Sequence, residues 1–113
     1  MKYCFSFIII LSNLFAVAQK NILIVGTYTT GKSQGIHTYS FDNKTGDIKE
    51  LDSIKSKNPS YVTVSTNKKY VYAVNEEGNN NGVGGSVSAY KLDAQTGKLI
   101  FINSVLRDRK SVV

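Results

Sequence analysis

The sequence predicts an all-β protein, and two observations support this fold class. Downstream of residue 18, no segment has apolar side chains at the spacing of about 3.6 residues that an amphipathic helix requires. Apolar residues instead alternate with polar ones or form short β-branched runs, and clusters of turn-forming residues separate these segments. We expect seven strands, at residues 22–28, 35–42, 48–54, 60–65, 70–75, 86–93 and 98–105.

The first three expected strands follow one another through short connections. The segment 22–28 opens with the apolar run ILIV. The segment 35–42 alternates strictly, so that every second side chain from His37 to Phe41 shares one face. The turn NKTG then ends in Gly46, which supplies the positive φ of a hairpin loop leading into the third strand.

The last four expected strands form a second set. Pro59 precedes the first of them, where its missing N–H does little harm. The polar turn TNKK at residues 66–69 and a glycine- and asparagine-rich loop at residues 78–85 make the next two connections. The last connection, AQTG, again ends in a glycine, Gly97.

The chain also contains an internal repeat. The segment YSFDNKTGDI at residues 39–48 recurs as YKLDAQTGKL at residues 90–99, an offset of 51. The run ILIV at residues 22–25 aligns with VYAV at residues 71–74, an offset of 49. A repeat of about 50 residues that holds four short strands is typical of a β-propeller blade. We therefore expect three strands of one blade and four of the next, too few blades to close a ring.

One motif suggests a nucleotide site. GTYTTGKS, from Gly26 to Ser33, matches the phosphate-binding pattern G-x-x-x-x-G-K-[ST]. That pattern binds phosphate only where a helix begins directly after the lysine and serine. Here Gly35 and the alternating, strand-like segment IHTYSFD come next. We therefore expect no nucleotide and interpret the motif as the loop between two neighbouring strands.

Residues 1–18 have the plan of a secretory signal peptide. Lys2 gives a positive start, residues 5–15 are mostly apolar, and AVA at residues 16–18 is a small-x-small cleavage site. The apolar core is shorter than the roughly 20 residues of a membrane span. We expect an exported protein, periplasmic or secreted, that starts at Gln19 and keeps no membrane segment. The alternative is a buried N-terminal element.

The segment DRKSVV at residues 108–113 is also set apart. The codons GAT CGG AAG AGC GTC GTG TAG encode this peptide and a stop, and they spell a common sequencing-library adapter. We therefore interpret residues 108–113 as a non-native tail and residues 19–107 as the N-terminal part of a longer propeller. The alternative is a natural basic C-terminus.

Charge and composition narrow the classes of partner. The formal net charge is +6 at pH 7, but Lys2, Arg109 and Lys110 lie outside residues 19–107, and the other lysines are mostly scattered among expected turns. Because no basic stripe is interleaved with aromatic residues, we expect no nucleic-acid partner. No group of His, Cys, Asp and Glu has the spacing of metal ligands, so we expect neither a metal nor another cofactor.

Three segments together resemble the bacterial lactonase family, the seven-bladed propellers typified by 6-phosphogluconolactonase. They are VGTYTTGKSQGIHTYSFDNKTGDIKEL, NPSYVTVSTNKKYVYAVNE and GSVSAYKLDAQTGKL, and the resemblance covers residues 22–105. It implies a hydrolase that opens a sugar-acid lactone by attack of water on the cyclic ester. The implied partner is a small sugar lactone, and an export signal favours an unphosphorylated one.

The resemblance also bears on the catalytic residues. In the family, His and Arg side chains from later blades act on the substrate, often as Pro-Arg-His at the start of a blade's innermost strand. The matching position here is Pro59-Ser60-Tyr61, which has neither Arg nor His. We therefore expect the catalytic residues to lie in further blades, and residues 19–107 to be inactive by themselves.

Asn58, Asn75 and Glu76 lie at expected strand ends and are candidate channel or substrate contacts. The alternatives are hydrogen bonding within loops for the two asparagines and a solvated loop acid for Glu76. His37, the only histidine, is a candidate base, but its place beside Tyr39 on one strand face favours a packing role.

Two other functions remain open. YVYAVN and VSAYKLD also suit a non-enzymatic secreted propeller that binds a glycan or a protein. Arg-His and Glu pairs at strand starts in further blades would distinguish the enzyme from that binding protein. A third possibility, a free-standing short β-protein, predicts that the 113-residue chain folds cooperatively and stays soluble.

Overall fold

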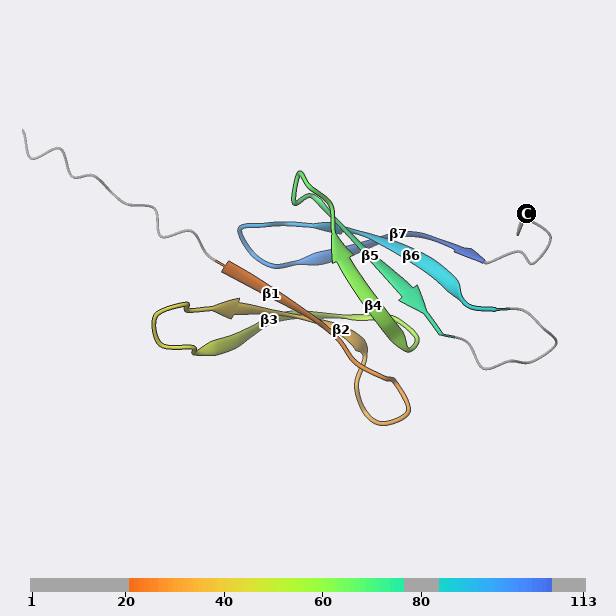
Figure 1. The fold of residues 1–113 in the computed structure, drawn as a ribbon, viewed down its shortest axis with the longest axis horizontal. Helices are drawn as coiled ribbons and strands as arrows, with labels where there is room; N and C mark the ends of the chain where they lie inside the picture. Colours follow the sequence, from red (N-terminus) through yellow and green to blue (C-terminus); the bar gives the residue numbers. More distant parts are fainter. Residues whose placement is uncertain (1–20, 77–83, 107–113) are drawn as a thin grey trace, which may run out of the picture.

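The structure, a computed structural model, describes residues 21–76 and 84–106 and is all-β over that part of the chain (Figure 1). The seven expected strands are all present. They are β1 (Asn21–Gly26), β2 (Gly35–Phe41), β3 (Ile48–Lys55), β4 (Pro59–Val64), β5 (Tyr70–Asn75), β6 (Ser86–Leu92) and β7 (Leu99–Leu106).

The strands form two antiparallel sheets. One sheet has the order β1-β2-β3 and the other the order β4-β5-β6-β7, which confirms the expected division into three strands and then four. Expected and observed bounds agree within two residues. The largest difference is in β1, which ends at Gly26 because Thr27 N already closes the following loop by donating to Gly35 O at 2.7 Å.

The pairing register corrects one part of the expected repeat. Ser40 and Lys91, which are 51 positions apart, lie opposite Ile22 and Tyr70 respectively. Ile22 is therefore equivalent to Tyr70, at an offset of 48 and not 49. The expected offset of 49 is therefore wrong. The difference matters because a shift of one residue moves every side chain of a strand to the opposite face.

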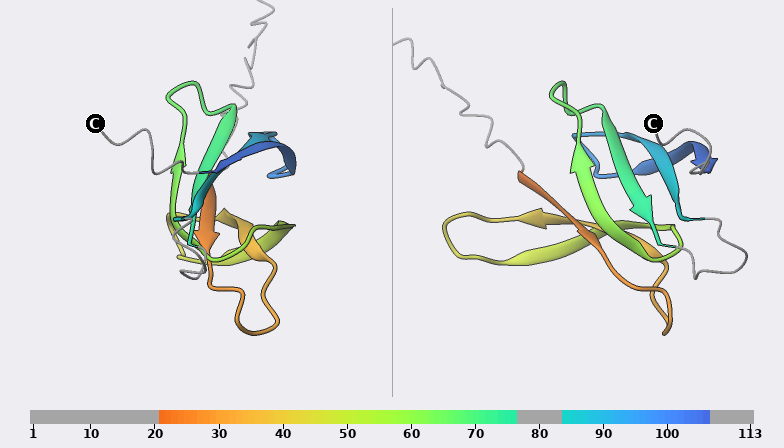
Figure 2. Two further views of the ribbon diagram at one scale, coloured as in Figure 1. Left: turned by 90° about the vertical axis from the view of Figure 1, so that its right-hand side faces the viewer. Right: turned by 45° about the vertical axis from the view of Figure 1, so that its right-hand side comes forward.

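The two sheets pack face to face. β1 lies against β4, and β3 lies against β7 (Figure 2). The buried apolar side chains are Ile36, Val71, Ala73, Tyr90, Leu92 and Leu99. Full burial of a large apolar side chain contributes about 1.5–3 kcal/mol, so this shared core holds the sheets together.

Several loops gather at one end of both sheets. We name it the linker end, because residues 56–58 pass there from β3 to β4. The β1–β2 loop lies at this end, since Ser56 N donates to Gln34 O at 2.8 Å. β5 also ends there, since Glu76 N donates to Asn58 O at 3.0 Å. Figure 1 shows the β1–β2 loop extending beyond the strand ends.

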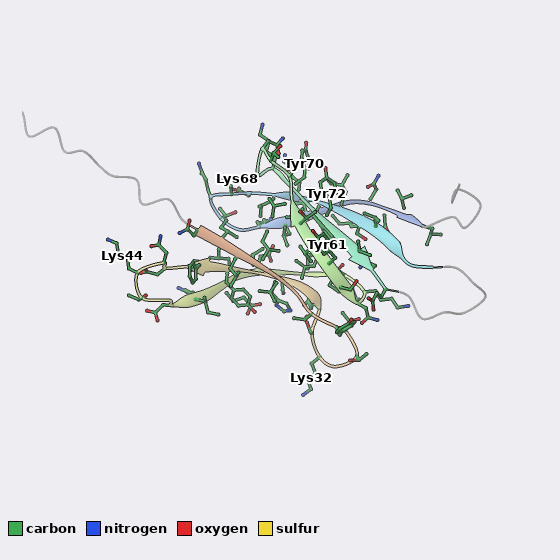
Figure 3. The ribbon with its side chains drawn as sticks, viewed as in Figure 1. Lys32, Lys44, Tyr61, Lys68, Tyr70 and Tyr72 are labelled. Atoms are coloured by element: carbon green, nitrogen blue, oxygen red, sulfur yellow. The ribbon has the colours of Figure 1, made fainter. Side chains whose placement is uncertain are left out.

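The outer face of the second sheet is apolar and open. Its Val87 is the repeat equivalent of Ile36, yet Val87 is 47% exposed whereas Ile36 is 0% exposed beneath the second sheet. Tyr61, Tyr70 and Tyr72 lie on the same outer face (Figure 3). Within the described residues, then, only the first sheet is covered on this face, as expected for two consecutive blades of a series.

Candidate functional site

The segment that resembles a phosphate loop connects two strands. β2 starts at Gly35, so a strand and not a helix follows Ser33. Gly26 has another role, because a Cβ on it would lie 2.8 Å from Pro59 O and 2.9 Å from Val62 Cγ2. Only glycine lets the end of β1 approach β4 this closely, so this glycine serves the packing of the sheets.

Asn58 joins the two sheets at the linker end. Its Oδ1 accepts hydrogen bonds from Thr29 N at 2.9 Å and Thr29 Oγ1 at 3.0 Å. Its Nδ2 donates to Glu76 O at 3.5 Å. Its φ is 39°, a left-handed conformation that asparagine tolerates better than most residues. These bonds correspond to the loop role considered for Asn58.

Asn75 is 3% exposed, and the described chain satisfies its whole amide. Its Nδ2 donates to Ser56 Oγ at 2.8 Å and to Lys57 O at 2.7 Å. Its Oδ1 accepts from Ser88 Oγ at 2.6 Å. A buried amide with all partners in place fixes the end of β5 against the linker, so Asn75 positions its neighbours, Glu76 among them.

Glu76 is the exposed member of the three candidates. Its Oε2 accepts a long hydrogen bond of 3.4 Å from Tyr28 OH, which comes from the β1–β2 loop. It borders a hollow of about 750 Å³ that lies over the open outer face of the second sheet, where Tyr72 and Val87 line it. The structure therefore brings Asn58, Asn75 and Glu76 to one end of the fold, and among these three described residues Glu76 has the exposed side chain.

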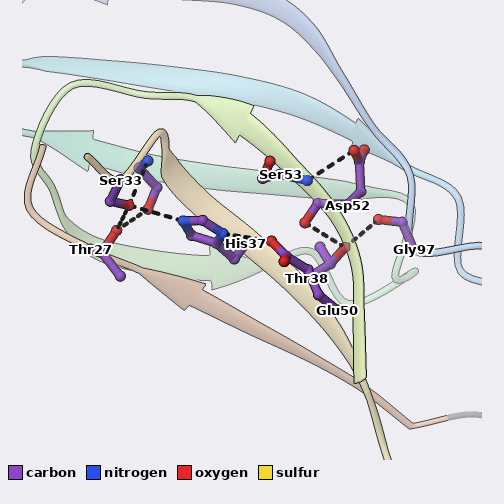
Figure 4. Close-up of polar contacts among 9 residues, drawn as sticks. Thr27, Ser33, His37, Thr38, Glu50, Asp52, Ser53 and Gly97 are labelled. Carbon is purple, nitrogen blue, oxygen red and sulfur yellow. Dashed lines mark hydrogen bonds and ion pairs between the residues drawn. The ribbon is translucent and has the colours of Figure 1, made fainter. Parts of the chain in front are cut away.

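His37 lies in a polar group that the sequence did not reveal. Its side chain is 17% exposed and its ring stacks on Tyr39, with centroids 6.3 Å apart. His37 Nε2 lies 2.9 Å from Ser33 Oγ, and Nδ1 lies 2.9 Å from Glu50 Oε1 (Figure 4). The expected packing role is therefore only part of what this side chain does.

Glu50 lies on the same sheet face as His37. From the NKTG turn onward, Phe41 pairs with Ile48 and Tyr39 with Glu50 without a break in register, so alternation alone puts Glu50 on this face. A β-bulge follows at Leu51 and turns Asp52 to the other face, opposite Thr38. Alternation from the turn is therefore the sequence signal for the pairing of Glu50 with His37, whereas no sequence signal marks the bulge.

The described residues offer little evidence for other kinds of site. Residues 21–76 and 84–106 hold no group of three or more His, Cys, Asp and Glu that could bind a metal ion. They also contain no helix long and apolar enough to cross a membrane. The expected signal peptide at residues 1–18 and the expected tail at residues 108–113 lie outside the described residues.

Comparisons with known proteins agree with the repeat and the sheets. A family model described as "Lactonase, 7-bladed beta-propeller" matches residues 22–113. The 6-phosphogluconolactonase of Bacillus subtilis (strain 168) is 37% identical over 93 residues, covering 81% of this chain and 26% of the relative.

Two solved structures are also similar. A crystal structure from Bacteroides fragilis NCTC 9343 matches with a TM-score of 0.71 at 36% identity, covering 79% of this chain and 24% of that one. The periplasmic gluconolactonase of Pseudomonas aeruginosa matches with a TM-score of 0.68 at 36% identity, covering 77% and 24%. The chain thus spans about a quarter of the length of the relatives that it matches.

Proposed function

Because the chain belongs to the lactonase family of seven-bladed β-propellers, we propose that the whole protein hydrolyses sugar-acid lactones. The observation that carries the proposal is the family match over residues 22–113, together with 37% identity to a 6-phosphogluconolactonase. Two blades do not make a complete channel, so the proposal concerns the whole protein.

The proposed reaction is ring opening by water. A general base removes a proton from water, and the water oxygen attacks the lactone carbonyl carbon. A cation or an N–H donor stabilises the oxyanion that forms. The ring C–O bond then breaks, the ring oxygen takes up the proton held by the base, and the product is the open-chain hydroxy acid. We propose that the base and the cation come from further blades, since Ser60 and Tyr61 occupy the positions where the family resemblance implies Arg and His.

Within this chain we propose a supporting role for the linker end. Glu76 has an exposed carboxylate at the linker end, so it is our candidate for contact with the sugar hydroxyls. Asn58 and Asn75 hold the two sheets at this end through their amide hydrogen bonds. The two asparagines position Glu76, and Glu76 alone of the three contacts the substrate.

We propose that residues 1–18 direct export, that residues 19–107 belong to the propeller, and that residues 108–113 are not native. The periplasmic location of the Pseudomonas aeruginosa relative supports export. Phosphorylated sugars are held inside cells, so an exported enzyme would act on an unphosphorylated aldonolactone. N-terminal sequencing of protein recovered from the periplasm tests the first part, and should start at Gln19.

The decisive experiment uses protein expressed from the complete gene, recovered by a long genomic read through codon 107. Hydrolysis of glucono-1,5-lactone is followed by acid release and compared with that of 6-phosphogluconolactone. We expect turnover above the spontaneous rate, with preference for the unphosphorylated substrate. No turnover of either lactone by folded protein would refute the enzyme, and turnover of the phosphorylated one alone would refute the substrate assignment.

Glu76→Gln tests the supporting residue. Loss of a charged hydrogen bond to substrate predicts a decrease in kcat/KM of roughly tenfold or more. Asp47→Asn, on an exposed turn at the opposite end, is the matched control and should leave kcat/KM unchanged. An unaltered kcat/KM in the Glu76→Gln protein would leave Glu76 as a solvated loop acid.

A further inference from the structure

Ser33, His37 and Glu50 form a continuous hydrogen-bonded chain. Ser33 Oγ lies 2.9 Å from His37 Nε2, and Glu50 Oε1 lies 2.9 Å from His37 Nδ1. Both distances fall in the range of about 2.6–3.2 Å expected between a nucleophile and its base and between the base and the group that orients it. Figure 4 shows the imidazole between the two partners.

Hydrogen-bonding rules fix the roles of the two ring nitrogens. A carboxylate only accepts hydrogen bonds, so His37 Nδ1 must carry the proton that Glu50 accepts. In a neutral imidazole, Nε2 is then the acceptor, and it can take the proton of the Ser33 hydroxyl. Thr27 Oγ1 also contacts Ser33 Oγ, and Gly35 N donates a hydrogen bond to Ser33 Oγ at 3.2 Å. These two contacts hold the serine in place.

The second blade shows that the fold itself does not need this group. At an offset of 51, the equivalents of Ser33, His37 and Glu50 are Gly84, Ser88 and Phe101. Each of the three positions therefore holds a different side chain in a sheet with the same bulge and the same strand order. Packing of a blade does not account for a serine, a histidine and a glutamate meeting in the first one.

The same comparison indicates which part of the group would stay exposed in a closed ring. The face of the second sheet that carries Ser88 and Phe101 is already covered by the first sheet. There Ser88 is 6% exposed, but Phe101 is still 53% exposed because it lies on the outermost strand. By equivalence, a blade packed on this face would bury His37 and leave Glu50 at the rim.

Ser33 opens onto a basic pocket. The pocket has a volume of about 790 Å³ and lies at the linker end, between the β1–β2 loop and the β3–β4 linker. Lys32, Lys55 and Lys57 line it, and no acidic residue does. Figure 3 shows Lys32 near the tip of the loop. Three ammonium groups favour a negatively charged ligand beside the hydroxyl.

We propose that Ser33 is a nucleophile for carboxylic esters whose acyl part carries a negative charge. Ser33 Oγ bonds to the ester carbonyl carbon as its proton passes to His37 Nε2. The C–O bond to the alcohol breaks, and the alcohol leaves with that proton. Water then hydrolyses the acyl-serine and releases the acid. Ser33 and His37 are the catalytic residues and Glu50 is a positioning residue; this site is independent of lactone opening at the channel.

A serine-directed phosphonofluoridate tests the nucleophile in the whole protein, separately from lactone turnover. Attack of Ser33 Oγ on phosphorus expels fluoride and leaves a stable adduct, which peptide mass spectrometry locates. We expect the adduct on Ser33 in the wild type and none at this position in Ser33→Ala. Ser65→Ala, in a turn at the other end of the sheets, is the matched control and should be labelled like the wild type.

Substitution of the base gives a second test in which the serine remains. His37→Gln should lower the labelling rate about 100-fold or more, as expected for loss of a general base, while circular dichroism verifies that the protein is folded. Wild-type protein without an adduct on Ser33, or an unchanged rate in folded His37→Gln, would overturn the proposal and leave the three residues as a brace for the loop.

Glu50 and the lysines each have their own measurement. Glu50→Gln should lower the labelling rate about tenfold, and Glu50→Asp, which restores a carboxylate, should recover part of it; equal rates for both variants would contradict the positioning role. Wild type should cleave mono-4-nitrophenyl succinate faster than 4-nitrophenyl acetate. The Lys55→Gln, Lys57→Gln double variant should lose that preference, and an unchanged preference would refute the anionic substrate class.

Discussion

Leu99 N donates a hydrogen bond to Asp52 Oδ2 at 2.9 Å, across the boundary between the two sheets. Asp52 lies in β3 and Leu99 begins β7, so the bond joins the outermost strands of two consecutive blades. The other carboxylate oxygen, Oδ1, accepts from Ser53 N at 2.9 Å and holds the side chain in this direction (Figure 4). The Asp52 side chain is therefore a polar contact between blades, made to the backbone of the core residue Leu99.

Asp52→Ala should destabilise the packing of the two sheets. The substitution leaves Leu99 N without its acceptor at a partly buried place, and loss of a hydrogen bond to a charged group costs about 1–3 kcal/mol. Urea unfolding of the purified protein measures the change. Asp47→Ala, at an exposed turn position, is the control and should lower the free energy of unfolding by less than about 0.5 kcal/mol. Equal effects would show that the bond between the sheets adds nothing.

Asp93 predicts a specific dependence of stability on pH. The backbone hydrogen bond from Gln95 N, with a second from Thr96 N, lowers the pKa of this carboxyl below its ordinary value of 3.8. The unfolded chain therefore takes up the proton first as the pH falls. The stabilisation is fully present well above pH 3.8 and is lost as the pH falls through the lower pKa of the folded state.

The measurement compares wild type with Asp93→Ala in urea at a series of pH values. We expect the wild type to be more stable at pH 6 to 7, and the difference to shrink steadily below about pH 3.8. A difference that stays constant down to pH 2 would mean that the ionised carboxylate is not the group that matters.

The sequence was sufficient for the strands and their division between blades. Alternation of side chains and the glycines of the NKTG and AQTG turns are local signals, and they located all seven strands within two residues. The offset of β1 was wrong by one residue because the alignment matched apolar letters. The register between β1 and β2 comes only from the structure, which pairs Ile22 with Ser40.

The contacts of the candidate site were beyond the reach of such signals. The partner of Asn58 is 29 positions away in the β1–β2 loop, and the bond between Asp52 and Leu99 spans 47 positions. Asp52 faces the second sheet only because of the bulge at Leu51. Long-range partners and bulges depend on how the sheets pack, which a single sequence does not record.

Asn75→Ala should cost more stability than any exposed substitution at the linker end. The change removes the partner of Ser56 Oγ, Lys57 O and Ser88 Oγ at a position that is 3% exposed. Buried polar groups left unsatisfied cost about 1–3 kcal/mol each, and because the two hydroxyls can turn to other partners, we expect a total of about 2–4 kcal/mol. Chemical unfolding measures the loss.

A paired kinetic measurement separates positioning from contact with substrate. If Asn75 only fixes the linker, Asn75→Ala should lower both kcat/KM and the free energy of unfolding. Glu76→Gln should lower kcat/KM and leave the free energy of unfolding unchanged. Asn43→Ala, in an exposed hairpin turn, is the control for the asparagine substitution. A stable Asn75→Ala protein with a raised KM would instead identify Asn75 as a substrate contact.

Gly46 and Gly97 provide a matched pair for measuring the packing between blades. They occupy equivalent turns and have nearly the same φ, 78° and 77°. A Cβ on Gly46 would meet nothing within 4 Å, whereas a Cβ on Gly97 would lie 2.6 Å from Cδ1 and 3.0 Å from Cβ of Leu51 in the neighbouring blade. Substitution by alanine therefore adds the same backbone strain at both sites but a steric conflict at only one.

We expect Gly46→Ala to cost about 1–2 kcal/mol, the strain of a left-handed conformation. Gly97→Ala should cost about 1–3 kcal/mol more, because Leu51 and the β3 backbone must shift. Adding Leu51→Ala removes Cδ1 but keeps Cβ, so it should relieve part of the excess in the Gly97→Ala protein, and a double-mutant cycle in urea measures this coupling. Equal costs at the two glycines, or no coupling to Leu51, would show that the two sheets are not packed in solution as the structure describes.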